Sequence, residues 1–225
     1  MKSRTLRLTL LCAALLPVAA FTMGGWAVVT VDDLPDYLVA GKPNDLAFVV
    51  RQHGVTMLRD LQPTVTLTSG STTATARARE INSGGHYLAS ITPPRAGQWT
   101  MRIQSGFGNS ANTLLPIEAI PANTQRPHSF LATADRGHQL FFAKGCVSCH
   151  VRGEDGLSGM KYAPNLTGRS FPAEPLSKFL ADPTANRLSA TASQDRMPNL
   201  QLKADEISAL VMFLNSDAKQ LGVRR

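Results

Sequence analysis

The sequence predicts two domains of different fold class, an N-terminal all-β sandwich and a C-terminal all-α domain. Short β-branched runs separated by turn residues fill residues 28–120. In residues 131–225 the apolar residues instead recur at helical spacing. Residues 121–130 lie between them and contain two prolines, polar residues and no periodicity, which is typical of a linker.

Residues 1–27 have the three parts of an export signal. Basic residues precede a long apolar run, and small residues, Gly25 and Ala27, occupy the two positions that a signal peptidase reads. We expect cleavage after Ala27, so that the mature chain begins near Val28. The alternative is an uncleaved membrane anchor, because the weakly polar stretch 8–29 approaches the length that spans a bilayer. Both readings predict an exported, periplasmic protein.

The formal net charge of +7 includes three basic residues within 1–27, and the other charges are scattered over both domains. No block of Lys and Arg alternates with aromatic residues, so nucleic acid is not a predicted partner. A weakly basic docking face for an acidic redox partner is one interpretation of these charges, and a solvated surface is the other.

The β-region contains about seven short strands at sandwich-like spacing. They are predicted at 28–31, 46–50, 64–68, 73–78, 87–91, 99–103 and 114–117. Turn-forming Gly, Pro, Asn and Ser residues separate them. Six large apolar residues of two of these strands are interpreted as facing core positions: Tyr87, Leu88, Ile91, Trp99, Met101 and Ile103.

Two stretches of this region carry a family resemblance. Gly85-His86-Tyr87-Leu88-Ala89 is followed by Pro93-Pro94-Arg95-Ala96-Gly97-Gln98-Trp99. This glycine-x-tyrosine strand, glycine-ended turn and tryptophan-bearing strand resemble the immunoglobulin-like periplasmic domains of the YtkA and FixH type. The resemblance implies an immunoglobulin-like fold and no particular function.

Helices are predicted at 134–144, 175–181 and 204–221. In the last of these, Ile207, Leu210, Val211 and Leu214 form an apolar stripe, and acidic residues occupy the first turn. The segments between the helices are rich in Gly, Pro and Asn. So small a ratio of core to loop is hard to stabilise in a domain of this size unless something else fills its centre.

Cys146-Val147-Ser148-Cys149-His150 is a C-x-x-C-H sequence, which indicates covalent attachment of haem c. Two thiols at this spacing bond the two vinyl groups of a haem, and the next residue, His150, becomes an axial ligand of the iron. A thioredoxin-like redox pair would need a βαβ pattern, which is absent. Zinc would need further ligands at matched spacing, and the nearby candidate is His138.

Residues 131–220 resemble the class I c-type cytochromes. Gly137 and Phe141 match the glycine and aromatic positions of the family's first helix, and Leu210 and Phe213 match the paired positions of its last helix. The resemblance implies that these two helices cross. It also implies that the carbonyl of Pro164 accepts a hydrogen bond from the ligating histidine. The family more often has glycine where this chain has Ala163.

Met197 is the predicted second axial ligand. It precedes Pro198 on an extended segment before the last helix, as in the methionine loop of the family. Met160, Met212 and His138 are the alternatives, and Met212 is interpreted as a packing residue. Histidine–methionine ligation closes both axial positions, which suits outer-sphere electron transfer. Arg169 and Arg196 are candidate partners for the haem propionates.

The predicted function is single-electron transfer by one covalent haem, with no catalysis. We expect the β-domain to dock the haem domain against a membrane-associated redox protein. A haem enzyme such as a peroxidase would need an open iron, which a methionine ligand argues against. A copper-handling protein with an accessory haem domain is the other alternative, since ligand-type residues are dispersed over the β-region. These residues are His53, Met57, His86, Met101 and His128.

Overall fold

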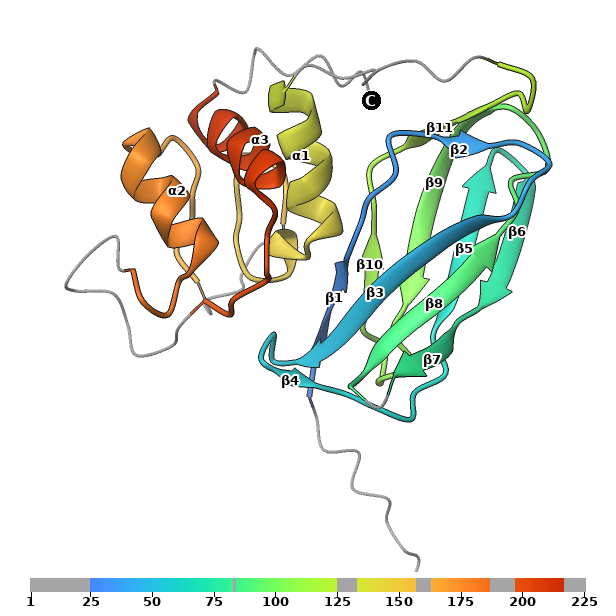
Figure 1. Ribbon diagram of the computed structural model, residues 1–225, viewed down its shortest axis with the longest axis horizontal. Helices are drawn as coiled ribbons and strands as arrows, with labels where there is room; N and C mark the ends of the chain where they lie inside the picture. Colours follow the sequence, from blue (N-terminus) through green and yellow to red (C-terminus); the bar gives the residue numbers. More distant parts are fainter. Residues whose placement is uncertain (1–24, 83, 125–132, 157–162, 187–196, 217–225) are drawn as a thin grey trace, which may run out of the picture.

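The computed structural model describes residues 25–82, 84–124, 133–156, 163–186 and 197–216. Two β-sheets form the N-terminal part, and three α-helices with one 3-10 turn form the C-terminal part (Figure 1). Most of the predicted export signal lies outside the described residues, as does most of the predicted linker. No helix among the described residues is long and apolar enough to cross a membrane.

The first sheet has the strand order β1-β3-β8-β7 with β4 paired to β3, and the second has the order β2-β11-β9-β5-β6 with β10 paired to β9. Only β2 and β11 pair in parallel among the described strands. The strands are β1 (Ala27–Val31), β2 (Leu38–Val39), β3 (Asn44–Gln52), β4 (Thr56–Met57), β5 (Thr64–Ser69), β6 (Thr72–Arg77), β7 (Arg79–Asn82), β8 (His86–Ile91), β9 (Gly97–Gln104), β10 (Ala111–Thr113) and β11 (Ile117–Ile120).

Six of the seven strands predicted from sequence are present. The prediction at 114–117 was wrong, because that segment mainly connects β10 to β11. Strands β2, β4, β7 and β10 were not predicted, since each spans only two to four residues and shows no alternation.

Strands β8 and β9 belong to different sheets, and both contribute buried residues to the core, as predicted. Tyr87 and Trp99 are fully buried, whereas Leu88 is only partly buried because successive strand residues point to opposite faces. The Tyr87 hydroxyl donates to Leu58 O at 2.9 Å, and Trp99 Nε1 donates to Arg95 O at 3.0 Å. The two largest core side chains therefore bury their rings without losing their hydrogen bonds.

Strand β1 is buried on both faces. Ala27, Val29 and Val31 belong to the hydrophobic core between the sheets. Val28 and Thr30 point to the opposite face, yet they are also buried, at 4% and 2% exposure. A strand covered on both sides needs a continuous apolar run, which explains the sequence Ala-Val-Val-Thr-Val.

The helices are α1 (Thr133–Ala143), α2 (Ala173–Ala181) and α3 (Ala204–Asn215), with the 3-10 turn η1 at Cys146–Ser148. All three predicted helices are present, but the predicted end of the last one at residue 221 was wrong, because α3 ends at Asn215 and Ser216 adopts an extended conformation. The predicted crossing of α1 and α3 is present. A Cβ at Gly137 would overlap Ala209 O and lie 2.6 Å from Phe213 Cβ, so only glycine allows this approach. Phe141 and Phe213 pack with ring centroids 5.4 Å apart.

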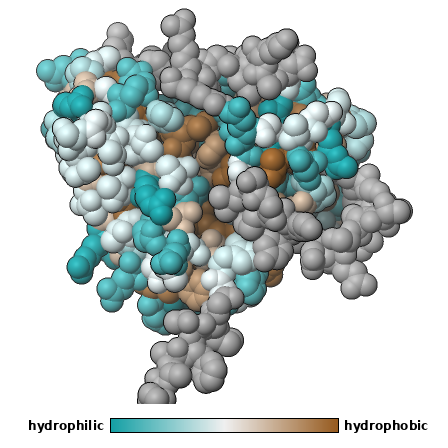
Figure 2. Space-filling view, turned by 180° about the vertical axis from the view of Figure 1, so that it is seen from behind, coloured by the Kyte–Doolittle hydropathy of each residue, from teal (hydrophilic) through white to brown (hydrophobic). Residues whose placement is uncertain are grey.

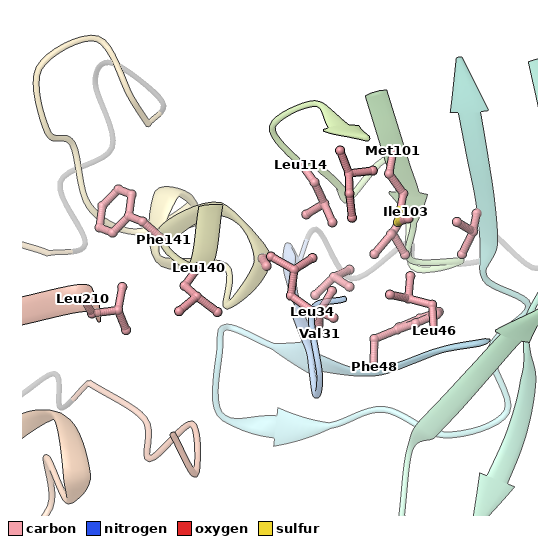
Figure 3. Packing of buried hydrophobic residues seen from close by; sticks show 14 of the residues in the cluster. Val31, Leu34, Leu46, Phe48, Met101, Ile103, Leu114, Leu140, Phe141 and Leu210 are labelled. Carbon is pink, nitrogen blue, oxygen red and sulfur yellow. The ribbon is translucent and has the colours of Figure 1, made fainter. Parts of the chain in front are cut away.

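One hydrophobic cluster runs through both parts of the chain. Leu140 and Phe141 on α1 and Leu210 on α3 belong to the same cluster as Val31 and Leu34 (Figure 3). Seen from behind, apolar side chains gather near the middle of the molecule, where sheets and helices meet (Figure 2). The two predicted domains therefore share a packed boundary.

Polar contacts reinforce this boundary. The Asn112 amide donates to Val29 O at 3.2 Å and to Phe142 O at 2.8 Å, which ties β1 to α1. Arg136 on α1 donates to Leu34 O and forms an ion pair with Asp36 at 3.3 Å. Burial lowers the pKa of Arg136, and Asp36 opposes this.

Candidate haem-attachment site

The C-x-x-C-H sequence forms a tight turn directly after α1. Gly145 has φ +78°, a left-handed conformation that ends the helix, and its N–H donates to Phe142 O at 2.9 Å. The chain then enters η1, and the N–H of His150 donates to Cys146 O at 2.8 Å. The two cysteines and the histidine are thus presented by one short, internally hydrogen-bonded segment.

Cys146 and Cys149 are free thiols and are both partly exposed. Burial raises the pKa of Cys146 to about 12, and the neighbouring Cys149 adds to this. Burial also raises the pKa of Cys149. A thioredoxin-like pair needs a thiol with a lowered pKa, so these two thiols do not have the electrostatics of a redox pair.

The His150 imidazole has the geometry that the family resemblance implies. Its Nδ1 lies 2.8 Å from Pro164 O. Because a carbonyl only accepts, Nδ1 carries the hydrogen, and Nε2 of the neutral ring is left with its lone pair for a metal. Burial lowers the pKa of His150, and the bond to Pro164 opposes this in part.

A backbone contact explains how Pro164 reaches the histidine. The N–H of Leu166 donates to Val151 O at 2.7 Å, which holds the segment after Pro164 against the residue after His150. Gly156 completes the turn, because a Cβ there would overlap His150 O.

The four candidates for the second axial ligand lie in different surroundings. Met197 is partly buried and packs against the hydrophobic cluster, whereas Met212 on α3 is 51% exposed. His138 is 8% exposed, and its Nε2 lies 2.7 Å from Asp155 Oδ2. Met160 lies outside the described residues. Met212 is therefore a surface residue and not the packing residue that was expected from the sequence.

The two predicted propionate partners, Arg169 and Arg196, remain predictions. Arg169 is exposed, and Arg196 lies outside the described residues.

A different arginine, Arg51 on β3, is 5% exposed, and its Nη1 has no hydrogen-bond partner among the described residues. Burial lowers the pKa of Arg51, and Asp32 opposes this. Sequence reasoning missed Arg51, because arginines are usually exposed.

Partly buried apolar side chains of the helical part pack against the hydrophobic cluster. They come from η1, from α2, and from the loops that carry Pro164 and Met197: Val147, Leu166, Phe171, Phe179, Met197 and Leu202. A flat, largely apolar group with two attachment points and one imidazole ligand fits this set of residues. The chemistry of the donors and of their surroundings is therefore that of a haem c site.

The residues considered for copper are not gathered at one place. Met101 is fully buried in the β-core, and His86 pairs with Asp32 at 3.5 Å. His53 and Met57 lie on the exposed β3–β4 hairpin. His128 lies outside the described residues. No group of three or more His, Cys, Asp or Glu side chains suited to a metal ion occurs in the part of the chain that the structure describes.

The fold and the site together define a covalent haem protein of the c type. Residues 134–217 match the family model of cytochrome c, so this part of the chain is a cytochrome c domain, which implies covalently bound haem c and supports a role in electron transfer. Cytochrome c domains of this kind are typically exported. A comparison with curated protein sequences gave no match.

Proposed function

We propose that this protein carries single electrons on one haem c bound through Cys146 and Cys149, with His150 and Met197 as axial ligands. The observation that carries the proposal is the 2.8 Å hydrogen bond between His150 Nδ1 and Pro164 O, within a C-x-x-C-H turn whose thiols are both free. A carbonyl that accepts a hydrogen bond from the imidazole in this way orients the ring and makes it a stronger ligand.

Each residue has a separate role in this proposal. The two cysteines hold the cofactor so that it is not lost after export, and His150 binds through Nε2. Met197 comes from a segment without regular secondary structure, so its thioether would be free to reach the iron as the second ligand. When bound, the haem supplies an iron that gains and loses one electron, and a thioether ligand raises its reduction potential relative to a second imidazole.

Filling both axial positions distinguishes an electron carrier from a haem enzyme. A peroxidase-like function needs one open position beside an acid–base group. With Met197 in place, no substrate reaches the metal. The reduced protein should therefore not bind carbon monoxide, and stoichiometric binding would favour the enzyme and count against the proposal.

Visible spectra of the full, matured chain test the ligands. We expect a thioether-haem spectrum after reduction and a weak sulfur–iron band in the oxidised protein. Met197→Ala should abolish that band, whereas the matched control Met212→Ala should keep it, because Met212 is half exposed on α3. A colourless protein, or pigment extracted by acidified acetone, would overturn covalent attachment.

We further propose export, by a cleaved signal or with the N-terminus left as a membrane anchor, and docking to a membrane-associated redox protein through the β-sheets. The support is the signal-like sequence of residues 1–27 and the packing of the sheets on the haem-binding helices. The immunoglobulin-like resemblance is consistent with two facing sheets. Intact mass of the mature protein locates its N-terminus. Capture of the membrane-associated partner tests docking. The full chain should retain the partner, and a variant altered on the surface of the β-sheets should lose it.

A further inference from the structure

The outer face of strand β1 lies against the cytochrome c domain. Its two outward side chains are Val28 and Thr30, which alternate with the residues that face the β-core. Thr30 Oγ1 donates to Lys144 O at 3.4 Å, directly before the haem-attachment turn. This face of β1 therefore packs against the cytochrome c domain, while the opposite face packs in the β-core.

Val28 contacts the segment that leads into Cys146. The backbone of Gly145 passes so close to β1 that a Cβ there would overlap Val28 Cγ1 and lie 2.8 Å from Val29 O. No other residue type fits at this position, since Gly145 also has a left-handed φ of +78°. Gly145, which precedes the C-x-x-C-H turn, is thus packed closely against β1.

The β3–β4 turn lies close to both the same valine and the methionine segment. His53 and Gly54 both have left-handed φ angles, +53° and +76°, which makes a tight turn. Gly54 has no Cβ, but a Cβ built there would lie 3.6 Å from Val28 Cγ2 and 3.7 Å from Pro198 Cγ, so Val28 and Pro198 border the same small space beside Gly54. In Figure 1 this turn lies beside the segment that enters α3.

The two segments that lie beside this corner of the sheet are the one that bears the cysteines with the histidine and the one that bears the methionine. Gly145 immediately precedes Cys146, and Pro198 immediately follows Met197. The methionine segment, residues 197–203, has no regular secondary structure of its own. Segments without regular structure and with few buried contacts open most readily, so an external support matters most there.

We propose that Val28, with the His53–Gly54 turn, positions the Met197 segment against the haem-attachment turn, so that the β-sheet stabilises the bond between the Met197 sulfur and the iron. The proposal rests on the proposed function, because it takes Met197 as the second axial ligand. Val28 is a positioning residue: it acts through Gly54 and Pro198 and touches neither the metal nor a redox partner.

Binding of imidazole to the oxidised, full-length holoprotein tests this role, because imidazole occupies the axial position only when the methionine has left it. Truncating Val28 to Ala removes the methyl groups that bridge Gly145 and Gly54. We expect the apparent imidazole affinity to rise about three- to tenfold, which is the size of a modest packing defect. The sulfur–iron band should weaken, and the reduction potential should fall.

Val31→Ala is the matched control. Val31 is a valine of the same strand and is also fully buried, but it faces the β-core. This variant should lower overall stability and leave imidazole affinity unchanged. Equal effects of Val28→Ala and Val31→Ala, or none from Val28→Ala, would overturn the proposal. Should Val28→Ala not mature, Val28→Thr keeps the shape while placing a hydroxyl in the contact, and the same shift is expected.

Pro198→Ala completes a double-mutant cycle. If Val28 acts through the packing beside Gly54 that it shares with Pro198, the shifts from Val28→Ala and Pro198→Ala should not add. Strict additivity would contradict that route. Failure of the proposed function looks different: the unmodified protein would then lack the sulfur–iron band, or Met197→Ala would bind imidazole no more tightly than the unmodified chain.

Discussion

Lys144 Nζ lies 2.7 Å from Glu206 Oε1, and the two side chains are only 3% and 9% exposed. The same ammonium donates to Asp32 O at 2.7 Å. One buried lysine therefore joins the loop after β1, the end of α1 and the start of α3. Glu206 is satisfied in a second way, since its Oε2 accepts from the N–H of Lys203 at 3.0 Å and caps α3.

Breaking this pair should be costly. Lys144→Met leaves Glu206 buried without its partner, and we expect the free energy of unfolding to fall by about 3–5 kcal/mol. Chemical denaturation of the holoprotein measures this. Glu174→Gln is the control, because the Glu174–Lys178 pair is exposed on α2. Its loss should cost less than about 0.5 kcal/mol. If both variants lowered the free energy of unfolding equally, the buried pair would contribute no more to stability than the exposed one.

Gly137→Ala should disrupt the crossing of α1 and α3. The added methyl group would overlap Ala209 O, so the two helices must move apart. We expect a loss of roughly 2 kcal/mol or more in the free energy of unfolding, or failure of haem maturation. Gly153→Ala is the comparison, since no atom lies within 4 Å of a Cβ there. Its left-handed φ of +62° should cost only about 1–2 kcal/mol. Normal stability of Gly137→Ala would contradict the close packing.

Tyr87→Phe should destabilise the β-part and flatten its response to alkali. The lost hydroxyl leaves Leu58 O and the N–H of Leu61 without their side-chain partner, at a cost of about 1–2 kcal/mol. Burial raises the pKa of Tyr87 above its ordinary value of 10.0.

The raised pKa gives this prediction a pH dependence with a definite sign. Below pH 10 the hydroxyl is protonated in both the folded and the unfolded chain, so its contribution is complete. As pH rises above 10 the unfolded chain loses this proton first, and the stability falls until the folded group also titrates. Denaturation curves between pH 7 and pH 11 should show a steeper alkaline loss in the unmodified protein than in Tyr87→Phe. Parallel curves would refute this.

Preventing haem attachment should unfold the helical part selectively. In Cys146→Ala/Cys149→Ala the apolar side chains around the site lose the group they surround, and the three helices have little other core. Hydrogen exchange read by mass spectrometry should show fast exchange in α1, α2 and α3. Strands β5, β8 and β9 should stay protected, because their core is complete without haem. Equal protection of both parts would show that the helices do not depend on haem.

Much of the fold could be predicted from local patterns. The long strands alternate or carry β-branched runs, and the helices have apolar stripes, so their positions followed from periodicity. The C-x-x-C-H sequence identified the haem-attachment turn, because its chemistry depends on adjacent residues. The contact of Gly137 with α3 was expected from the resemblance to class I c-type cytochromes, and not from the helical pattern alone.

The contacts between the two parts could not be predicted in the same way. Lys144 and Glu206 are 62 positions apart, and nothing in the local sequence shows that a lysine at a helix end is buried. The pairing of His138 with Asp155, and the stacking of His138 on Phe213 at 4.7 Å, likewise depend on the tertiary fold. The proline-containing segment 121–130 suggested a loose connection, but linker composition describes only the chain between two units. It does not describe how their surfaces meet.

Both faces of β1 are buried, so dividing the chain between its two parts would expose apolar surface to water. Separating the haem-binding half would uncover the face of α1 that rests on Leu34 and Asn112, and would strip Val28 and Thr30 of their cover. Replacing one part with the corresponding part of a different protein would leave the same buried surfaces without a matching partner. The two halves are therefore expected to be inherited, and to diverge, as a single unit.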